Sequence, residues 1–365
     1  MRKGLAAAGV VALITAGSAA CGTDHTTPQG KVDKAFSSFG GQNTVTLGLA
    51  FDGSADQIYA SMKDEDDFTR DDAKLLASLH LSLGVTTPKS FKLLGKAHTA
   101  QGGAFTLALS TDESGDTSLA EIRVVDQKLF LHADVKGLEK LAPNQNSTDI
   151  QQLNQFLDQA DQLPSSLNSV KAALKGQWIS LDPKAFADFA KSMGGSSGDD
   201  SGSDPLAGGL PGVPKIDAAT RAKIVDALRQ AFTTNVTYKD LGNHDGADHV
   251  QVTAPAKQLA KAIDDGLTPV LKDIPGYDST ALSGLQDVPN KTISADVGVK
   301  DGKLKSITFD VEQLDDQATG KLPLTLTFDG SAKAISAPPG AQVVNPQDIV
   351  GLVMSGLGKD DSDSV

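Results

Sequence analysis

The clearest structural signal in the chain lies in Ala295-Asp296-Val297-Gly298-Val299-Lys300-Asp301-Gly302-Lys303-Leu304. Asp-Gly is a residue pair typical of tight two-residue turns. Apolar residues alternate with other residues before this turn and again after it, at Ile307, Phe309 and Val311, as in strands with one buried face. The stretch therefore predicts an antiparallel β-hairpin.

An earlier stretch has the same pattern. Ala120-Glu121-Ile122-Arg123-Val124-Val125-Asp126-Gln127-Lys128-Leu129 aligns with the first stretch without a gap, sharing Ala, an acid, an aliphatic residue, Val, Asp, Lys and Leu at equal spacing. Two hairpins could have converged on this pattern, since such turns are common, or the chain could contain an internal duplication. We favour duplication and expect two related lobes.

Other segments predict a mixture of strands and helices. Alternating apolar residues predict further strands at 45–51, 79–85, 105–109, 178–181, 235–241, 249–253 and 322–328. Helical spacing predicts helices at 32–39, 55–62, 149–174 with a break at Pro164, 183–193 capped by Asp182, 217–232, and from Pro255 onward. The acidic segment 63–72 is expected to be a loop, and the proline-rich segment 337–341 is expected to end the sheet. The fold class is therefore α+β with an antiparallel sheet.

The segment 194–214 predicts the main domain boundary, because it is rich in Gly, Ser, Asp and Pro and has no hydrophobic periodicity. We expect it to link an N-terminal lobe, 31–193, to a C-terminal lobe, 215–344, and an acidic tail to occupy 345–365. One string within it, Gly194-Gly195-Ser196-Ser197-Gly198, matches a nucleophile-elbow motif in letters only, since no strand is expected to precede it and no helix to follow it.

The N-terminal segment Met1–Cys21 predicts export. Arg2 and Lys3 precede an apolar run, and small residues lead to Cys21, the only cysteine of the chain. This arrangement resembles the lipobox of bacterial lipoproteins, which implies a diacylglycerol anchor on Cys21, a flexible tether over 22–30, and a location on the outer face of the cell membrane. The alternative is ordinary secretion, with Cys21 left as a free thiol.

Composition and spacing exclude several functions. The formal net charge of -13 makes nucleic acid an improbable partner. The acidic runs at 63–72, 199–204 and 360–363 favour solvated segments over calcium sites. The histidines match no HExxH or other metal spacing, whether His80, His98 and His132 or His244 and His249 are considered. We therefore expect no metal, no cofactor and no enzymatic activity.

The second half of the chain resembles the LolA-like superfamily, especially the actinobacterial LppX/LprG envelope lipoproteins. The resemblance rests on the 295–304 hairpin, the strand 322–328, the closing segment 337–341, and the strand and helix of 249–263. It implies a curved antiparallel half-barrel with helices on its concave face, and acyl chains held between the sheet and the helices.

The apolar positions of the expected strands are candidates for lining such a space. They are Phe105, Leu107, Leu109, Ile122, Val124, Leu129, Leu131, Val297, Val299, Phe309, Leu324, Leu326 and Phe328. The same residues could equally be ordinary core, because alternating apolar residues facing helices occur in any α+β protein. The function expected from the resemblance is binding of an apolar ligand, a lipid, by a tethered lipoprotein. The alternative is a structural or protein-interaction lipoprotein with a solid core.

Overall fold

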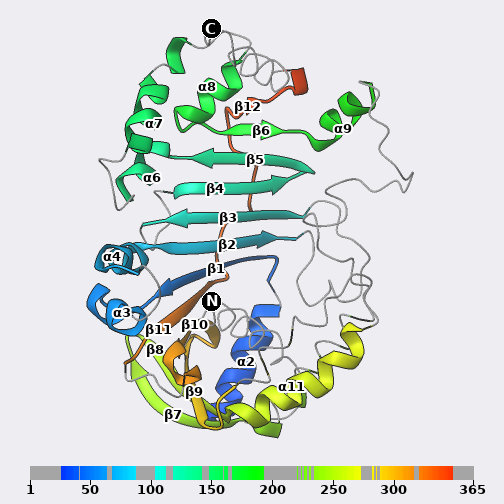
Figure 1. Ribbon diagram of the computed structural model, residues 1–365. Helices are drawn as coiled ribbons and strands as arrows, with labels where there is room; N and C mark the ends of the chain where they lie inside the picture. Colours follow the sequence, from blue (N-terminus) through cyan, green and yellow to red (C-terminus); the bar gives the residue numbers. More distant parts are fainter. Residues whose placement is uncertain are drawn as a thin grey trace. The chain divides into compact units, whose positions relative to one another are not determined.

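The computed structural model describes residues 26–40, 42–63, 68–87, 103–111, 118–141, 148–158, 160–162, 167–192, 234–272, 288–315 and 320–347, with a few single positions between 220 and 285. Twelve strands in these residues belong to an open, mostly antiparallel sheet, and eight α-helices accompany them (Figure 1). The predicted α+β class with an antiparallel sheet is confirmed.

The chain divides into two compact units, and each unit is built from two separate segments. Unit 1 comprises Met1–Gln101 and Pro214–Lys333, and unit 2 comprises Gly102–Val213 and Ala334–Val365. Strand β1 (Thr44–Phe51) pairs with β11 (Pro323–Asp329), so strands from the two ends of the chain share unit 1. The boundaries of the predicted lobes, 31–193 and 215–344, do not coincide with those of the units. The predicted linker 194–214 lies outside the described residues.

Unit 1 contains seven strands in the order β2-β1-β11-β10-β9-β8-β7. Every pair in this series is antiparallel. The remaining strands are β2 (His80–Thr86), β7 (Thr237–His244), β8 (Ala247–Pro255), β9 (Thr292–Lys300) and β10 (Lys303–Asp310). A 3-10 helix, η5 (Val311–Leu314), follows β10 where the sequence suggested that the strand continues through Val311.

The core of unit 1 lies between one face of this sheet and three helices, α2 (Pro28–Gly40), α3 (Ala55–Met62) and α4 (Arg70–Ser78). The helices contribute Phe36, Ile58 and Ala73, which pack with strand residues such as Val250 and Ile307. Helix α11 (Ala256–Leu271) begins directly after β8, as predicted from Pro255, and buries Leu259 and Leu267.

Helix α4 corrects the prediction that 63–72 is a loop throughout. Thr69 is the N-cap of α4, and its side chain accepts a hydrogen bond from the Asp72 N–H while the Asp72 carboxylate accepts from the Thr69 N–H. This reciprocal capping box satisfies backbone donors that the first turn leaves unpaired. The acidic residues Asp71 and Asp72 therefore start a helix and also complement its dipole.

Unit 2 contains five strands in the order β12-β6-β5-β4-β3. They are β3 (Ala104–Ser110), β4 (Ser118–Val125), β5 (Lys128–Ala133), β6 (Ile179–Leu181) and β12 (Gln342–Val343). Strand β12 pairs in parallel with β6 and lies after the proline-rich segment that was expected to end the sheet. The expectation was wrong because Gln342 and Val344 keep their N–H groups, which donate to the carbonyls of Trp178 and Ser180.

The helices of unit 2 are α6 (Val135–Leu141), α7 (Thr148–Asp158), α8 (Asn168–Leu174) and α9 (Pro183–Ser192), with a 3-10 helix, η2 (Ala160–Gln162). The Asp182 carboxylate accepts hydrogen bonds from the backbone N–H groups of Lys184 and Ala185, at 3.0 and 3.4 Å, which confirms the predicted cap of α9. Helix α6 was not predicted.

Three hairpins share one turn geometry. The turn residues are Asp126 and Gln127 between β4 and β5, Asp245 and Gly246 between β7 and β8, and Asp301 and Gly302 between β9 and β10. In each turn both residues have a positive φ. Two-residue turns of this kind match the right-handed twist of the flanking strands. The two tight hairpins predicted from the repeated pattern are confirmed, while the duplication that we favour as their origin stays a prediction.

Candidate functional site

One face of the unit 2 sheet carries two adjacent rows of apolar side chains. Strand register places Phe105, Val124, Leu129 and Leu181 in one row, and Leu107, Ile122, Leu131 and Ile179 in the next. Leu109 extends the face, opposite Ala120. Side chains that lie directly opposite each other on neighbouring strands have Cβ atoms about 5 Å apart, so these rows form one continuous surface.

The side chains of this surface are only partly buried. None of them is in the buried core of the described residues, and Ile122 keeps 39% of its surface exposed. Ile122 alone is exposed and the other side chains of the rows are half-buried. Single exposed apolar residues are ordinary, whereas apolar rows that keep contact with solvent over several strands favour an interaction site. We call the face made by these two rows and Leu109 the unit 2 apolar face; its members are Phe105, Leu107, Leu109, Ile122, Val124, Leu129, Leu131, Ile179 and Leu181.

The opposite face of the same strands is closed by the segment 334–344. Phe130, Val125 and Ala104 are buried there with Trp178, Ile335 and Ala341. The Arg123 guanidinium lies 4.7 Å above the Trp178 ring and donates a 3.3 Å hydrogen bond to the Ser336 carbonyl. The opposite face of these strands therefore has an apolar part, which the segment 334–344 covers, beside a charged part in which Arg123 pairs with Glu121.

The candidates in unit 1 have a different environment. Val297, Val299, Phe309, Leu324, Leu326 and Phe328 are only 3–4% exposed, and they pack in the core with α2, α3 and α4. Toward β1 and β2 this face becomes less buried, since Leu47, Leu49 and Phe51 are partly exposed and Leu81 is 38% exposed. The structure therefore divides the sequence candidates into a closely packed set in unit 1 and a partly exposed set in unit 2.

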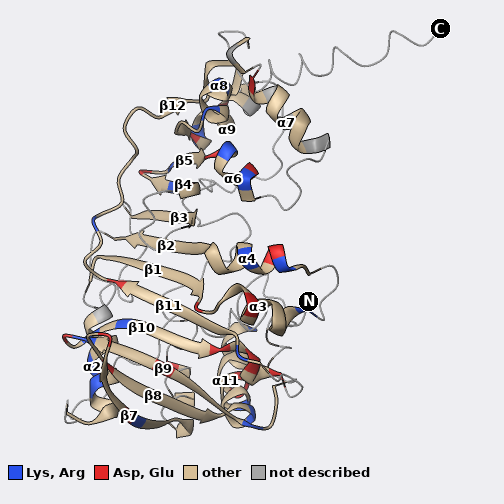
Figure 2. Cartoon of the chain, turned by 90° about the vertical axis from the view of Figure 1, so that its left-hand side faces the viewer, with Lys and Arg blue, Asp and Glu red and all other residues tan. Residues whose placement is uncertain are grey.

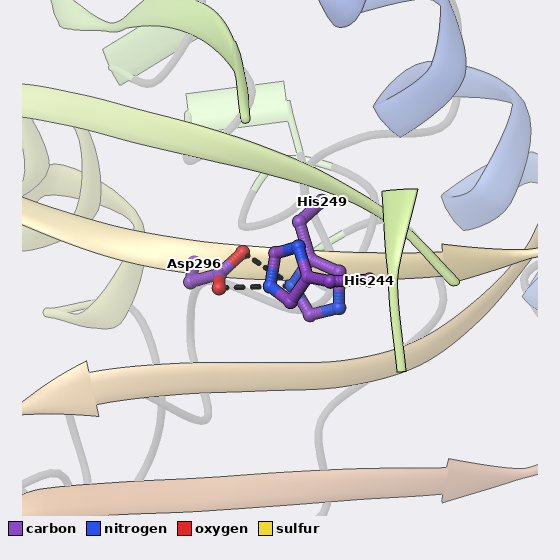
Figure 3. Close-up of side chains that lie close together, drawn as sticks. All are labelled: His244, His249 and Asp296. Carbon is purple, nitrogen blue, oxygen red and sulfur yellow. Dashed lines mark hydrogen bonds and ion pairs between the residues drawn. The ribbon is translucent and has the colours of Figure 1, made fainter. Parts of the chain in front are cut away.

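A cluster of two histidines and a carboxylate lies on the other face of the unit 1 sheet (Figure 3). His249 Nδ1 is 2.9 Å from Asp296 Oδ2 and 3.0 Å from Asp296 Oδ1, and the His244 and His249 rings are stacked with centroids 3.5 Å apart. Each residue offers a ligand atom within 4.8 Å of those of the other two. Among the described residues this is the group of His, Cys, Asp and Glu side chains that could hold a metal ion.

Sequence reasoning missed this cluster for two reasons. Asp296 lies 47 residues after His249 in the chain, and only the pairing of β8 with β9 brings the two together. A β-bulge between Asp240 and Gly242 also shifts the register of β7 against β8, which sets where His244 lies relative to His249. The short interval between His244 and His249, spanning an Asp-Gly turn, was the available signal.

Charged groups surround the junction of α2 with the β7–β8 hairpin. Lys31 Nζ lies 2.9 Å from Asp240 Oδ2 and 3.6 Å from Asp248 Oδ2. The hydrogen bond to Asp240 raises the pKa of Lys31, and in turn the hydrogen bond from Lys31 lowers the pKa of Asp240. Charged residues otherwise gather mainly on helices and near the ends of strands (Figure 2).

Cys21, the predicted export signal and most of the predicted acidic tail lie outside the described residues. The predicted tether 22–30 is described from Thr26 onward, and its last three residues form the start of α2, which begins at Pro28. No helix in the described part of the chain combines the length and the apolar character needed to cross a membrane. The chain matches no protein-family model and no curated protein.

Proposed function

We propose that this protein is an exported lipoprotein that binds an apolar ligand, the acyl chains of a lipid, on the unit 2 apolar face. The observation that carries the proposal is the partial burial of two complete rows of large aliphatic and aromatic side chains across four strands. A folded protein gains roughly 25 cal/mol for each Å² of apolar surface removed from water. An acyl chain laid over these rows would gain about 0.8 kcal/mol for each buried methylene.

The family resemblance rests on the second half of the chain, and the proposal extends the finer arrangement that it implies to the sheet of unit 2. In it the sheet curves as a half-barrel, helices lie on its concave face, and the ligand occupies the space between them. An anchor on Cys21 would hold the protein at the outer face of the cell membrane, where lipid is available as ligand. The net charge of -13 supports carriage of an apolar or uncharged group more than of an anionic headgroup.

A binding titration with paired variants tests the proposal. Ile122→Asn places a polar amide in the middle of the unit 2 apolar face, where it should weaken binding of a fluorescent fatty acid by about tenfold, or 1.4 kcal/mol. Leu241→Asn is the matched control, because Leu241 is 41% exposed, close to the 39% of Ile122, and lies at the bulge of β7 in unit 1. The chain beginning at Gly22 serves for both, so that the lipid anchor does not compete with the probe.

The result also separates the proposal from its alternative, a structural or interaction lipoprotein. Saturable binding that Ile122→Asn weakens and Leu241→Asn preserves would support the lipid site. Absence of saturable binding by the parent chain would favour the alternative. In that case the sheet of unit 2 would serve only as a surface or a core, as the closely packed sheet around Val299 and Leu326 does in unit 1.

A further inference from the structure

The polar face of the unit 1 sheet positions His249 between two glycines. Its cross-strand neighbours are Gly242 on β7 and Gly298 on β9, so no side chain stands beside the imidazole on either strand. A Cβ added at Gly298 would lie 3.6 Å from His249 Cε1 and 2.5 Å from Ser306 Oγ. The His249 ring and the Ser306 hydroxyl therefore occupy the space that a side chain at position 298 would need. The imidazole can therefore lie across the strands, and only 13% of the His249 side chain is exposed.

The residues that approach His249 come from the diagonal positions on both sides. His244 lies two residues beyond Gly242 on β7, and Asp296 lies two residues before Gly298 on β9. Residues two apart on a strand project from the same face. The bulge in β7, the turn at Asp245-Gly246 and the two glycines therefore bring three potential ligands to one point of a rigid sheet (Figure 3).

The geometry of this group suits metal binding. The His244 and His249 rings are stacked with their centroids 3.5 Å apart, so their nitrogens lie close together on this face of the sheet. The contact between His249 Nδ1 and the Asp296 carboxylate orients the ring, and when Nδ1 carries the proton, Nε2 keeps its lone pair. A carboxylate that accepts from one nitrogen of a metal-binding histidine is a common arrangement in metal sites.

We propose that His244, His249 and Asp296 bind a divalent transition-metal ion of the zinc type. Imidazole nitrogen and carboxylate oxygen are the donors that Zn²⁺ accepts in tetrahedral sites, with bonds of roughly 2.0–2.2 Å. Donor atoms in such a site are about 3.3 Å apart, so the present spread of up to 4.8 Å requires a small closure. His244 supplies it, because it is exposed and lies at the end of a hairpin. Asp296 either binds the ion directly or holds His249 in place.

The site is tested by titrating the full chain with Co²⁺, which reports coordination through its visible absorption, followed by competition with Zn²⁺. The parent chain should bind one equivalent saturably, and Zn²⁺ should displace it. His244→Ala should weaken binding at least tenfold with little effect on folding, because the side chain is exposed. Asp296→Asn should weaken it by roughly 10-fold to 100-fold. The control is His80→Ala, which removes a histidine of β2 that is not part of the cluster.

Two readouts keep the test decisive. Zn²⁺ should raise the thermal midpoint of the parent and of His80→Ala by equal amounts, and should raise that of His244→Ala by less at the same Zn²⁺ concentration. A Co²⁺ spectrum with a thiolate charge-transfer band would assign binding to Cys21 and overturn the proposal. So would the absence of saturable binding, or equal affinity in the parent and His244→Ala, since the stacked rings and the contact between His249 and Asp296 would then be structural only.

Discussion

Tyr238 and Asp33 show how burial changes individual residues in unit 1. Burial raises the pKa of Tyr238 to about 12, and the nearby Asp33 carboxylate adds to this effect because it opposes a second negative charge. Burial also raises the pKa of Asp33, whose Oδ2 atom is buried without a hydrogen-bond partner. For both groups, burial makes the charged form less favourable than it is in water.

The Tyr238 hydroxyl should ionise well above the usual pKa of a tyrosine. Because its folded pKa is raised from 10.0 to about 12, its contribution to stability is fully present below pH 10 and is lost as the pH rises toward 12. An absorbance titration of tyrosinate should show a step near pH 12 that Tyr238→Phe removes. Asp33→Asn should shift this step to lower pH, while Tyr59→Phe should leave it in place. A titration of Tyr238→Phe that matches the parent at high pH would contradict this assignment.

The exposure of individual apolar residues could not be predicted from the sequence. The apolar character of Ile122 and of Val299 was evident from alternation, but their different exposures, 39% and 4%, depend on which helices reach each strand. Alternation gives the face on which a side chain lies and gives no information on what covers that face. The clustering of His249 with Asp296 likewise depends on pairing between β8 and β9, which local pattern does not encode.

At the scale of elements, the repeated hairpin was the most predictable feature. Its register is explained by the turns, since Val125 pairs with Lys128 and Lys300 pairs with Lys303 across two-residue turns of the same geometry. One difference between the two turns is informative. Gln127, with φ of 64°, occupies the position that Gly302, with φ of 71°, occupies in the second hairpin. A residue with a Cβ is strained in this region, and Gly is not.

Exchange of these two residues should therefore have opposite effects. Gln127→Gly should raise the free energy of unfolding by roughly 0.5–1 kcal/mol. The substitution removes the strain of a left-handed residue with a Cβ, and the greater conformational freedom of glycine in the unfolded chain offsets part of that effect. Gly302→Gln should lower it by about 1 kcal/mol, with the flexible Lys34 side chain moving aside. Urea denaturation measures both, and Lys128→Gly, one residue beyond the turn, should only destabilise. Destabilisation by Gln127→Gly would show that the turn is held by its side chain.

Other elements followed from local chemistry only in part. Asp182 and Pro183 predicted the start of α9 because capping and the first-turn proline are local signals. Strand β12 was not predicted because it consists of two residues, and its pairing with β6 is parallel and long-range. Helix α4 was missed because acidic composition suggested a loop, although Thr69 and Asp72 have the spacing of a capping box.

At the scale of the whole molecule, the two units are interleaved in sequence. The pairing of β1 with β11 joins residues from opposite ends of the chain, and the order of segments along the sequence does not reveal it. Bringing residues so distant in sequence together lowers the conformational entropy of the chain between them. The pairing of β1 with β11 is specified by the apolar side chains that the two strands bury together. A division into successive lobes was therefore the natural prediction, and the units have other boundaries.

The proposed anchor on Cys21 would determine on which side of the membrane the whole molecule lies. Cys21→Ala removes the only thiol of the chain, and with it the proposed attachment point for a diacylglycerol. The variant should leave the membrane fraction or accumulate with its signal segment uncut. Cell fractionation and the mass of the mature chain report both outcomes. Membrane retention with normal processing of Cys21→Ala would contradict the lipoprotein assignment.

Native mass spectrometry of the purified chain beginning at Gly22 tests the central claim, lipid binding on the unit 2 apolar face, most directly. We predict a population one lipid heavier than the bare chain, whose added mass is released by organic solvent and identified as an acyl lipid. Ile122→Asn should deplete this population, and Leu241→Asn should retain it. A parent chain found only in its bare form, even after incubation with fatty acid or phospholipid, would contradict the account and leave the apolar face as a surface for another protein.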